Sequence, residues 1–163
     1  NAIVVDEGAT SSLLLFDALA AAPPSTLLTL TGGAIGQGLP CATGAAIACR
    51  DRKVVAVQAD GSAMYTLQAL WTQARESLDV ITLLCSNRSY RILQIELHRA
   101  GHREAAAAAR ALTELAPPVL DWVKLAEGMG VPAVRVESAD ALVRELEIAL
   151  AEPGPHLLEL ALP

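Results

Sequence analysis

Apolar and polar positions along the chain alternate between short apolar runs and longer stretches with helical spacing. Apolar runs without strict alternation predict strands that are covered on both faces. We expect strands at Ala2–Val5, Thr26–Thr31, Lys53–Ala59, Val80–Cys85, Ala133–Val136 and His156–Leu162. We expect helices at Ser11–Ala22, Gly36–Cys49, Leu67–Ser77, Tyr90–Ala100, Leu120–Gly128 and Ala139–Ala151. The alternation predicts the α/β class, with three α/β/α layers around a mainly parallel sheet of about six strands.

The stretch from Gly101 to Pro118 fits this alternation least well. Residues 105–109 are all alanine, which favours a helix but offers little side chain to bury. We interpret the stretch as a loosely docked helix or a mobile loop. No repeat or second domain is visible, so residues 1–163 are interpreted as one domain. The chain begins at Asn1 without a methionine and enters an apolar run at once, so we expect it to be a piece of a longer polypeptide.

Composition narrows the classes of partner. With 53% hydrophobic and 18% charged residues, the chain has the apolar content of a folded domain. Its net charge of −6 and the lack of a basic tract argue against nucleic acid and against an anionic membrane surface. Any anionic ligand must therefore be held locally, by backbone amides, a helix N-terminus or a metal.

Two further observations concern the compartment. Cys41, Cys49 and Cys85 lie in apolar or alanine-rich stretches without metal-ligand spacing, so we interpret them as small buried side chains in a reducing cytoplasm. No apolar run approaches the roughly 20 residues that cross a bilayer. The sequence therefore predicts a cytoplasmic protein with no membrane partner.

Candidate chemistry lies in the turns that follow the first four predicted strands. These turns are 6–11, 31–38, 59–62 and 85–89. Each has an ordinary structural explanation: glycine-rich and Asp-Gly turns are common between strand and helix, and Thr10 or Ser11 fits a helix cap. Their combination is more informative, because ligands of open parallel sheets bind at the carboxyl ends of strands.

Asp60 and Asn87 follow consecutive strands, and parallel strands bring such ends to the same edge of the sheet. A carboxylate and an amide oxygen, with a backbone carbonyl nearby, suit Mg²⁺. So small a ligand set leaves room for phosphate oxygens and water. The pair therefore predicts a magnesium site that holds a phosphate group.

These residues carry a resemblance to a known family. Ala59-Asp60-Gly61-Ser62 followed by Asn87 resembles the GDG(S)…N signature of thiamine-diphosphate-dependent enzymes. Residues 32–40 and 65–75 are similar to the glycine-rich cofactor loop and the following helix of the acetolactate synthase, benzoylformate decarboxylase and pyruvate decarboxylase group. The resemblance covers essentially the whole chain and implies a Rossmann-like, thiamine-diphosphate-binding fold.

The resemblance implies a set of cofactor contacts. Asp60, the side chain of Asn87 and the carbonyl of Ser89 would hold Mg²⁺. Gly61 and Ser62 would contact the diphosphate of thiamine diphosphate. Further contacts are implied at Ala9, Thr10, Ala34, Ser89 and Tyr90.

Two residues are implied in setting the conformation of the cofactor. The carbonyl of Gly33 would accept a hydrogen bond from the aminopyrimidine, and Ile35 would wedge the cofactor into a V shape. That shape brings the 4′-nitrogen against the reactive carbon, so that the cofactor takes its own proton.

The sequence departs from the family pattern in two respects. Ala59 stands where the signature has its first glycine, which removes no ligand atom. The family's activating glutamate comes from a separate pyrimidine-binding domain, on the same or a partner chain, and Glu7, Glu76 and Glu96 belong to the wrong domain for that role. The resemblance thus implies half a site, negligible turnover by this chain alone, and a homo-oligomer, a dimer or tetramer.

Substrate contacts are expected on the helix 90–100. Leu93 and Glu96 lie one turn apart on one face and are candidates for lining the substrate pocket. The alternative makes Leu93 a core residue and Glu96 a solvated one. Trp71 and Trp122 occur in apolar helical patterns and are expected in the core.

The leading hypothesis is the diphosphate-binding domain of an enzyme that decarboxylates a 2-oxo acid or joins the product to an acceptor. A second is a complete small subunit of a two-chain decarboxylase. A third is a non-catalytic nucleotide- or diphosphate-binding module, although the GxGxxG order of a dinucleotide site is missing.

Overall fold

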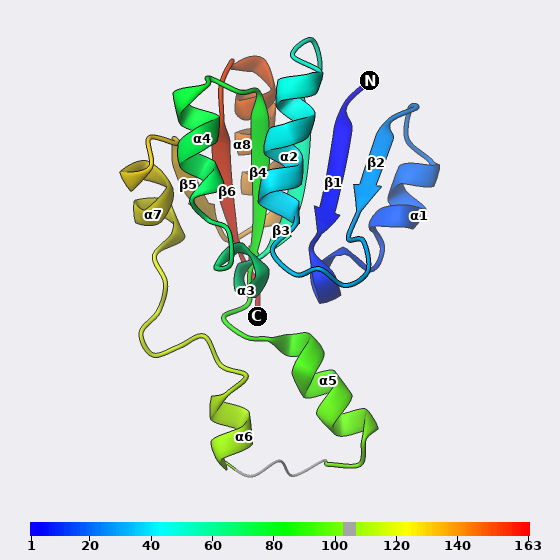
Figure 1. Cartoon of the computed structure of the whole chain (residues 1–163), viewed down its shortest axis with the longest axis vertical. Helices are drawn as coiled ribbons and strands as arrows, with labels where there is room; N and C mark the ends of the chain where they lie inside the picture. Colours follow the sequence, from blue (N-terminus) through cyan, green and yellow to red (C-terminus); the bar gives the residue numbers. More distant parts are fainter. Residues whose placement is uncertain (103–106) are drawn as a thin grey trace.

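The computed structural model describes residues 1–102 and 107–163, in which all strands belong to one parallel sheet (Figure 1). The strands are β1 (Ile3–Glu7), β2 (Thr26–Thr29), β3 (Val54–Ala59), β4 (Val80–Ser86), β5 (Ala133–Val136) and β6 (His156–Ala161). Their order across the sheet is β2-β1-β3-β4-β6-β5, and each neighbouring pair is parallel. The predicted α/β class and parallel sheet are confirmed.

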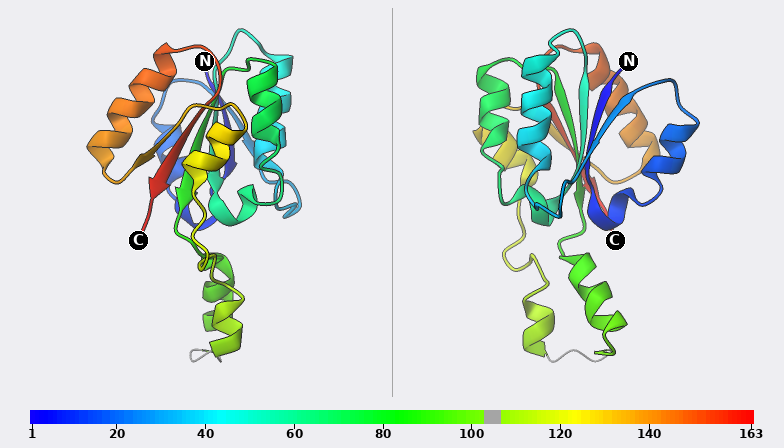
Figure 2. Two further views of the ribbon diagram at one scale, coloured as in Figure 1. Left: turned by 90° about the vertical axis from the view of Figure 1, so that its left-hand side faces the viewer. Right: turned by 45° about the vertical axis from the view of Figure 1, so that its right-hand side comes forward.

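Helices cover both faces of the sheet, as Figure 2 shows. They are α1 (Leu15–Ala20), α2 (Gly38–Ala48), α3 (Asp60–Ala63), α4 (Ala69–Arg75), α5 (Arg91–Arg99), α6 (Ala107–Ala111), α7 (Trp122–Gly128) and α8 (Ala139–Ala151). A 3₁₀ turn, η1 (Ala9–Ser12), follows β1. Helices α2, α4 and α7 lie on one face, whereas α1 and α8 lie on the other.

The core explains why the central strands are apolar at successive positions. Val54 of β3 and Val80 of β4 pack under α2, and Leu84 and Leu157 pack under α4 and α7. Ile81 contributes to a third cluster beneath α8. Burial on both faces removes the alternation that a one-sided sheet would show.

Expectations about individual core residues were only partly right. Trp122 is fully buried at 1% exposure, as expected. Trp71 is 52% exposed, so its placement in the core was wrong; the Arg75 guanidinium lies 4.8 Å from its ring centroid, a cation–π contact at the surface. Of the cysteines, Cys85 is buried, whereas Cys41 and Cys49 are half-buried where α2 packs on the sheet.

One predicted segment differs from the structure, and a second is described only in part. The helix expected at Ser11–Ala22 is instead the short 3₁₀ turn η1 followed by α1, with a turn at the exposed Leu13 and Leu14 between them. In the 101–118 stretch, α6 is present, but residues 103–106, which include part of the alanine run, lie outside the described ranges. Helices α5 and α6 extend beyond the carboxyl edge of the sheet (Figure 1).

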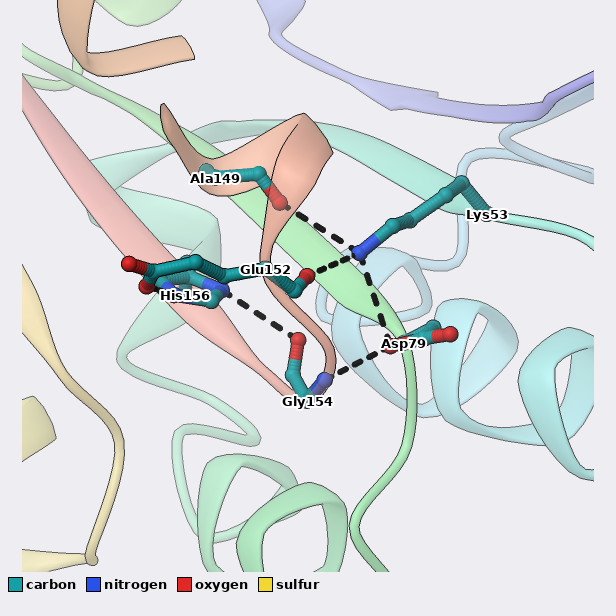
Figure 3. A network of polar contacts seen from close by, with 6 residues as sticks. All are labelled: Lys53, Asp79, Ala149, Glu152, Gly154 and His156. Carbon is teal, nitrogen blue, oxygen red and sulfur yellow. Dashed lines mark hydrogen bonds and ion pairs between the residues drawn. The ribbon is translucent and has the colours of Figure 1, made fainter. Parts of the chain in front are cut away.

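The amino edge of the sheet carries a polar clamp, drawn in Figure 3. Lys53 Nζ donates to the carbonyls of Ala149 and Glu152 at the end of α8, and lies 3.5 Å from Asp79 Oδ1. The same Asp79 oxygen accepts from the Gly154 amide at 2.6 Å. A cation at a helix C-terminus satisfies carbonyls that have no partner within the helix. This clamp fixes α8 to the strands on which it packs.

The opposite, carboxyl edge contains the topological switch point. The chain leaves β1 towards β2 on one side and leaves β3 towards β4 on the other. The crevice outside the carboxyl ends of β1 and β3 is where an open α/β sheet binds its ligand.

Candidate functional site

A pocket of about 420 Å³ lies at this switch point. It is lined by the turns that follow the first four strands, together with the start of α5. The predicted residues among its lining are Ala9, Thr10, Gly33, Ile35, Asp60, Gly61, Ser62, Asn87, Ser89 and Tyr90. Ala34 lies between two lining residues in the chain and is not itself part of the lining. The structure therefore brings together the turns that the sequence singled out.

Asp60 begins α3, directly after β3, and is 2% exposed. Its Oδ1 accepts from the Gly61 amide at 2.8 Å, and its Oδ2 accepts from the Arg88 amide at 2.7 Å. Burial raises the pKa of the Asp60 carboxyl, and the hydrogen bonds from the backbone offset part of that rise. The bond to Arg88 ties the turn after β3 to the turn after β4.

The turn after β4 is shaped by its own side chain. Asn87 Oδ1 accepts from the Ser89 amide at 3.0 Å, and Arg88 between them has a left-handed φ of 57°. Ser89 Oγ donates to the carbonyl of Thr113 at 3.1 Å. Asn87 is thus held at the same edge as Asp60, as the pairing of β3 with β4 at Ala59 and Cys85 requires.

Gly61 is required by close packing. A Cβ at this position would lie 2.5 Å from Cε1 of Tyr90, because the tyrosine ring packs over the start of α3. The next residue, Ser62, donates from its Oγ to the carbonyl of Ala59 at 3.0 Å. The absence of a side chain at Gly61 therefore allows the Tyr90 ring to lie against the start of α3.

The glycine-rich turn lies on the other side of the pocket and depends on a residue to which sequence reasoning gave no role. Gly33 has φ of 69° and Gly36 has φ of 89°. Glu7, the last residue of β1, accepts hydrogen bonds from the amides of Gly36 and Gly38, each at 2.6 Å. Ile35 remains 47% exposed at the pocket lining.

Leu93 and Glu96 are placed elsewhere. They line a separate hollow between α5 and α6 with Leu97 and Leu112, outside the pocket at the switch point. Leu93 is 48% exposed and Glu96 forms an ion pair with Arg99 at 2.7 Å. Their assignment to a substrate pocket stays a prediction.

Asp60, Asn87 and Ser89 form the candidate magnesium site at this edge. Within residues 1–102 and 107–163, no group of three His, Cys, Asp or Glu side chains is placed to hold a metal, and no basic side chain in those ranges pairs with Asp60. A buried carboxylate without a cationic partner is costly. One carboxylate, one amide oxygen and a backbone carbonyl fit Mg²⁺ that keeps water and phosphate ligands. The residues present therefore fit the ion.

Comparisons with known proteins identify the family of the chain. The family model described as "Thiamine pyrophosphate enzyme, C-terminal TPP binding domain" matches residues 9–160. The "Putative acetolactate synthase large subunit IlvX" of Mycobacterium tuberculosis is 52% identical over 100% of this chain and 32% of its own length. Benzoylformate decarboxylase of Pseudomonas aeruginosa is 31% identical over 98% of this chain and 29% of its own length.

A solved structure shares the fold. The thiamine diphosphate-dependent 4-hydroxybenzoylformate decarboxylase of Rhodococcus jostii RHA1 superposes with a TM-score of 0.84 at 30% identity, over 99% of this chain and 29% of that chain. The fold and pocket define a cofactor-binding α/β domain. The chain belongs to the thiamine pyrophosphate enzyme family, in the part described as its C-terminal TPP-binding domain. It spans about a third of the length of these relatives.

One further finding concerns membranes. In the described part of the chain, no helix is both long and apolar enough to cross a bilayer.

Proposed function

We propose that this domain anchors thiamine diphosphate through Mg²⁺ within a 2-oxo acid decarboxylase or carboligase. The observation that carries the proposal is the buried Asp60 carboxylate, which is hydrogen-bonded to the turn of Asn87 at the switch-point pocket and has no basic partner among the described residues. Asp60, the Asn87 side chain and the Ser89 carbonyl would hold the ion. A divalent cation there would neutralise the carboxylate and the diphosphate together.

The other pocket residues divide between the two ends of the cofactor. Gly61, Ser62, Ala9 and Thr10 line the pocket near the start of α3 and in η1, and they would lie on the side of the diphosphate. The second end would lie along the glycine-rich turn, residues 31–38.

On that side, the Gly33 carbonyl would orient the aminopyrimidine, Ile35 would act as the wedge, and Ala34 would complete the turn. Tyr90 would close the pocket above Gly61. When bound, thiamine diphosphate supplies the carbanion-stabilising group of such enzymes. The residues of this chain bind and orient it.

The activity of the whole protein is part of the same proposal. Two relatives are named for decarboxylation of benzoylformate or its 4-hydroxy derivative, and one as an acetolactate synthase subunit. We propose a 2-oxo acid substrate, a pyrimidine-binding domain on the same or a partner chain, and a homo-oligomer whose subunits complete the site. A cytoplasmic location is supported by the three unpaired cysteines.

Calorimetric titration of the full-length protein with thiamine diphosphate tests the anchoring role. We expect saturable binding in Mg²⁺, none in EDTA, and none of unphosphorylated thiamine. Asp60→Ala should abolish the Mg²⁺-dependent part, whereas Asp51→Ala, an exposed aspartate in the loop before β3, should bind as wild type does. Unchanged Mg²⁺-dependent binding by Asp60→Ala would contradict the metal assignment, and preference for adenine or nicotinamide nucleotides would favour a nucleotide-binding module.

A further inference from the structure

Glu7 is a buried acid that has no part in the proposed function so far. It is 4% exposed at the carboxyl end of β1, in the lining of the pocket. Oε1 accepts from the Gly36 amide and Oε2 from the Gly38 amide, each at 2.6 Å. Oε2 also accepts from Gln58 Nε2 at 3.0 Å. Hydrogen bonds to a carboxylate at such distances are among the strong ones in proteins.

The carboxylate also caps a helix from a distant part of the chain. Gly38 is the first residue of α2, and Gln37, at the cap position, makes no side-chain cap hydrogen bond. The start of a helix exposes unpaired amides and carries partial positive charge. Glu7 accepts a hydrogen bond from one of these amides, that of Gly38. It also accepts one from the Gly36 amide in the preceding turn.

Steric contact makes the arrangement specific. A Cβ at Gly38 would lie 2.7 Å from Glu7 Oε2 and 2.1 Å from Gln58 Oε1. Close approach of the backbone to the acid is therefore possible only at a glycine. The turn that ends at Gly38 is held against β1 and β3 by contacts that leave no space for a side chain.

Gln58 extends the connection to the other side of the pocket. Its Nε2 donates to Glu7 Oε2 and to Ser62 Oγ, the latter at 2.6 Å. Gln58 is fully buried in β3, two residues before Asp60. One chain of hydrogen bonds thus joins the glycine-rich turn, through Glu7 and Gln58, to the start of α3.

We infer that Glu7 is a positioning residue that sets the glycine-rich turn, with Gly33 and Ile35, at a fixed distance from the turn that holds Asp60. The inference rests on the proposed function, because it assigns the two turns to the two ends of one cofactor. Glu7 acts through the amides of Gly36 and Gly38.

Glu7→Gln is the informative variant, since it preserves shape and leaves a single acceptor oxygen for two amides. Glu159→Gln is the control: Glu159 is similarly buried, at 2% exposure against 4% for Glu7, but it pairs with Arg135 at 3.4 Å and lies in β6 outside the pocket. The first measurement is hydrogen exchange of the amides of Gly36 and Gly38 in the cofactor-free full-length protein. We expect exchange to be about tenfold faster in Glu7→Gln. Exchange in β4 should stay unchanged, which separates local loosening from general destabilisation.

The second measurement compares two ligands in the presence of Mg²⁺. Affinity for thiamine diphosphate should fall about tenfold in Glu7→Gln, whereas affinity for inorganic diphosphate, which reaches only the Asp60 side, should stay within about twofold. Glu159→Gln should match wild type in both measurements.

The outcomes separate this inference from the proposed function. If wild type binds thiamine diphosphate and Glu7→Gln is unchanged in exchange and affinity, the positioning role is wrong. Equal losses for both ligands would also overturn it, because the effect would then not be confined to the glycine-rich turn. If wild type itself fails to bind thiamine diphosphate, the proposed function fails, and the exchange result alone decides whether Glu7 holds the turn. Should Glu7→Gln not fold, Glu7→Asp, which keeps the charge but is too short to reach both amides, gives the same two readings.

Discussion

Ile35 is a large apolar side chain that stays 47% exposed at the pocket lining. A side chain that packs only against a bound cofactor contributes to its conformation more than to the stability of the fold. We expect Ile35→Ala in the full-length protein to lower kcat on the order of 10- to 100-fold, because small misplacement of reacting groups is costly. The dissociation constant for thiamine diphosphate should change by less than about threefold. Ile47→Ala, at a similarly exposed position on α2, is the control, and equal losses in kcat and affinity for Ile35→Ala would remove the wedge role.

Cys85, at the end of β4, gives a pH-dependent prediction. Burial raises the pKa of its thiol from 9.0 to about 11, with a smaller lowering by Ser11 and smaller rises from Asp60 and Asp6. Between these values the unfolded thiol has lost its proton while the folded thiol keeps it, so stability falls as the pH rises from 9 to about 11. Relative to Cys85→Ala, wild type should lose roughly 2 kcal/mol over this interval. Urea denaturation of both proteins at pH 8 and pH 10.5 measures the difference, and a constant difference would contradict the prediction.

Asp60 and Glu7 differ in how far their roles could be predicted from the sequence. Asp60 and Asn87 could be placed together because each follows a strand directly and the strands are neighbours. Glu7 could not be assigned, because two of its partners lie 29 and 31 residues away and are backbone amides, which every residue except proline has. The sequence does show an acid at the end of a predicted buried strand. It does not show that this strand lies at the switch point, because the switch point is defined by the order of the strands in the sheet.

At the scale of elements, α8 depends on the clamp formed by Lys53 at the amino edge (Figure 3). Lys53→Met keeps the aliphatic stem and removes the donors to the last carbonyls of α8 and to Asp79. Since the Lys53 side chain is 23% exposed, we expect a loss of about 1 kcal/mol, below the range for fully buried charged hydrogen bonds. Arg144→Met on the exposed part of α8 should change stability by less than about 0.5 kcal/mol. Urea denaturation checks both, and equal effects would mean that the clamp adds nothing.

Elements with strong local signals were predicted best. The bounds of β5 and α8 agree with the structure because Ser138 caps α8 and the sequence Pro153-Gly154-Pro155 ends it. The helix predicted at Ser11–Ala22 was too long, because its apolar residues Leu13 and Leu14 are 74% and 77% exposed and do not form a buried face. Periodicity shows that a face is apolar and not whether anything covers it.

For the whole molecule, the balance of charge decides how the ligand can bind. The chain carries a net charge of −6, and the pocket adds the carboxylates of Asp60 and Glu7, yet the proposed ligand ends in a diphosphate. These charges repel unless a cation lies between them. Neither Mg²⁺ nor thiamine diphosphate alone should therefore stabilise the domain appreciably, whereas both together should.

The size of this effect follows from binding linkage. At a ligand concentration of 100 times the dissociation constant, binding adds about 2.7 kcal/mol to the free energy of unfolding. For a unit of this size, that raises the unfolding temperature by roughly 5 to 10 °C, and the shift is smaller where a longer chain unfolds as one unit. Differential scanning calorimetry of the full-length protein should show the shift with Mg²⁺ and cofactor together and lose it in EDTA. Asp60→Asn, which keeps the shape of the side chain, should abolish the shift, and a shift that persists in EDTA would mean that backbone amides, not the metal, hold the diphosphate.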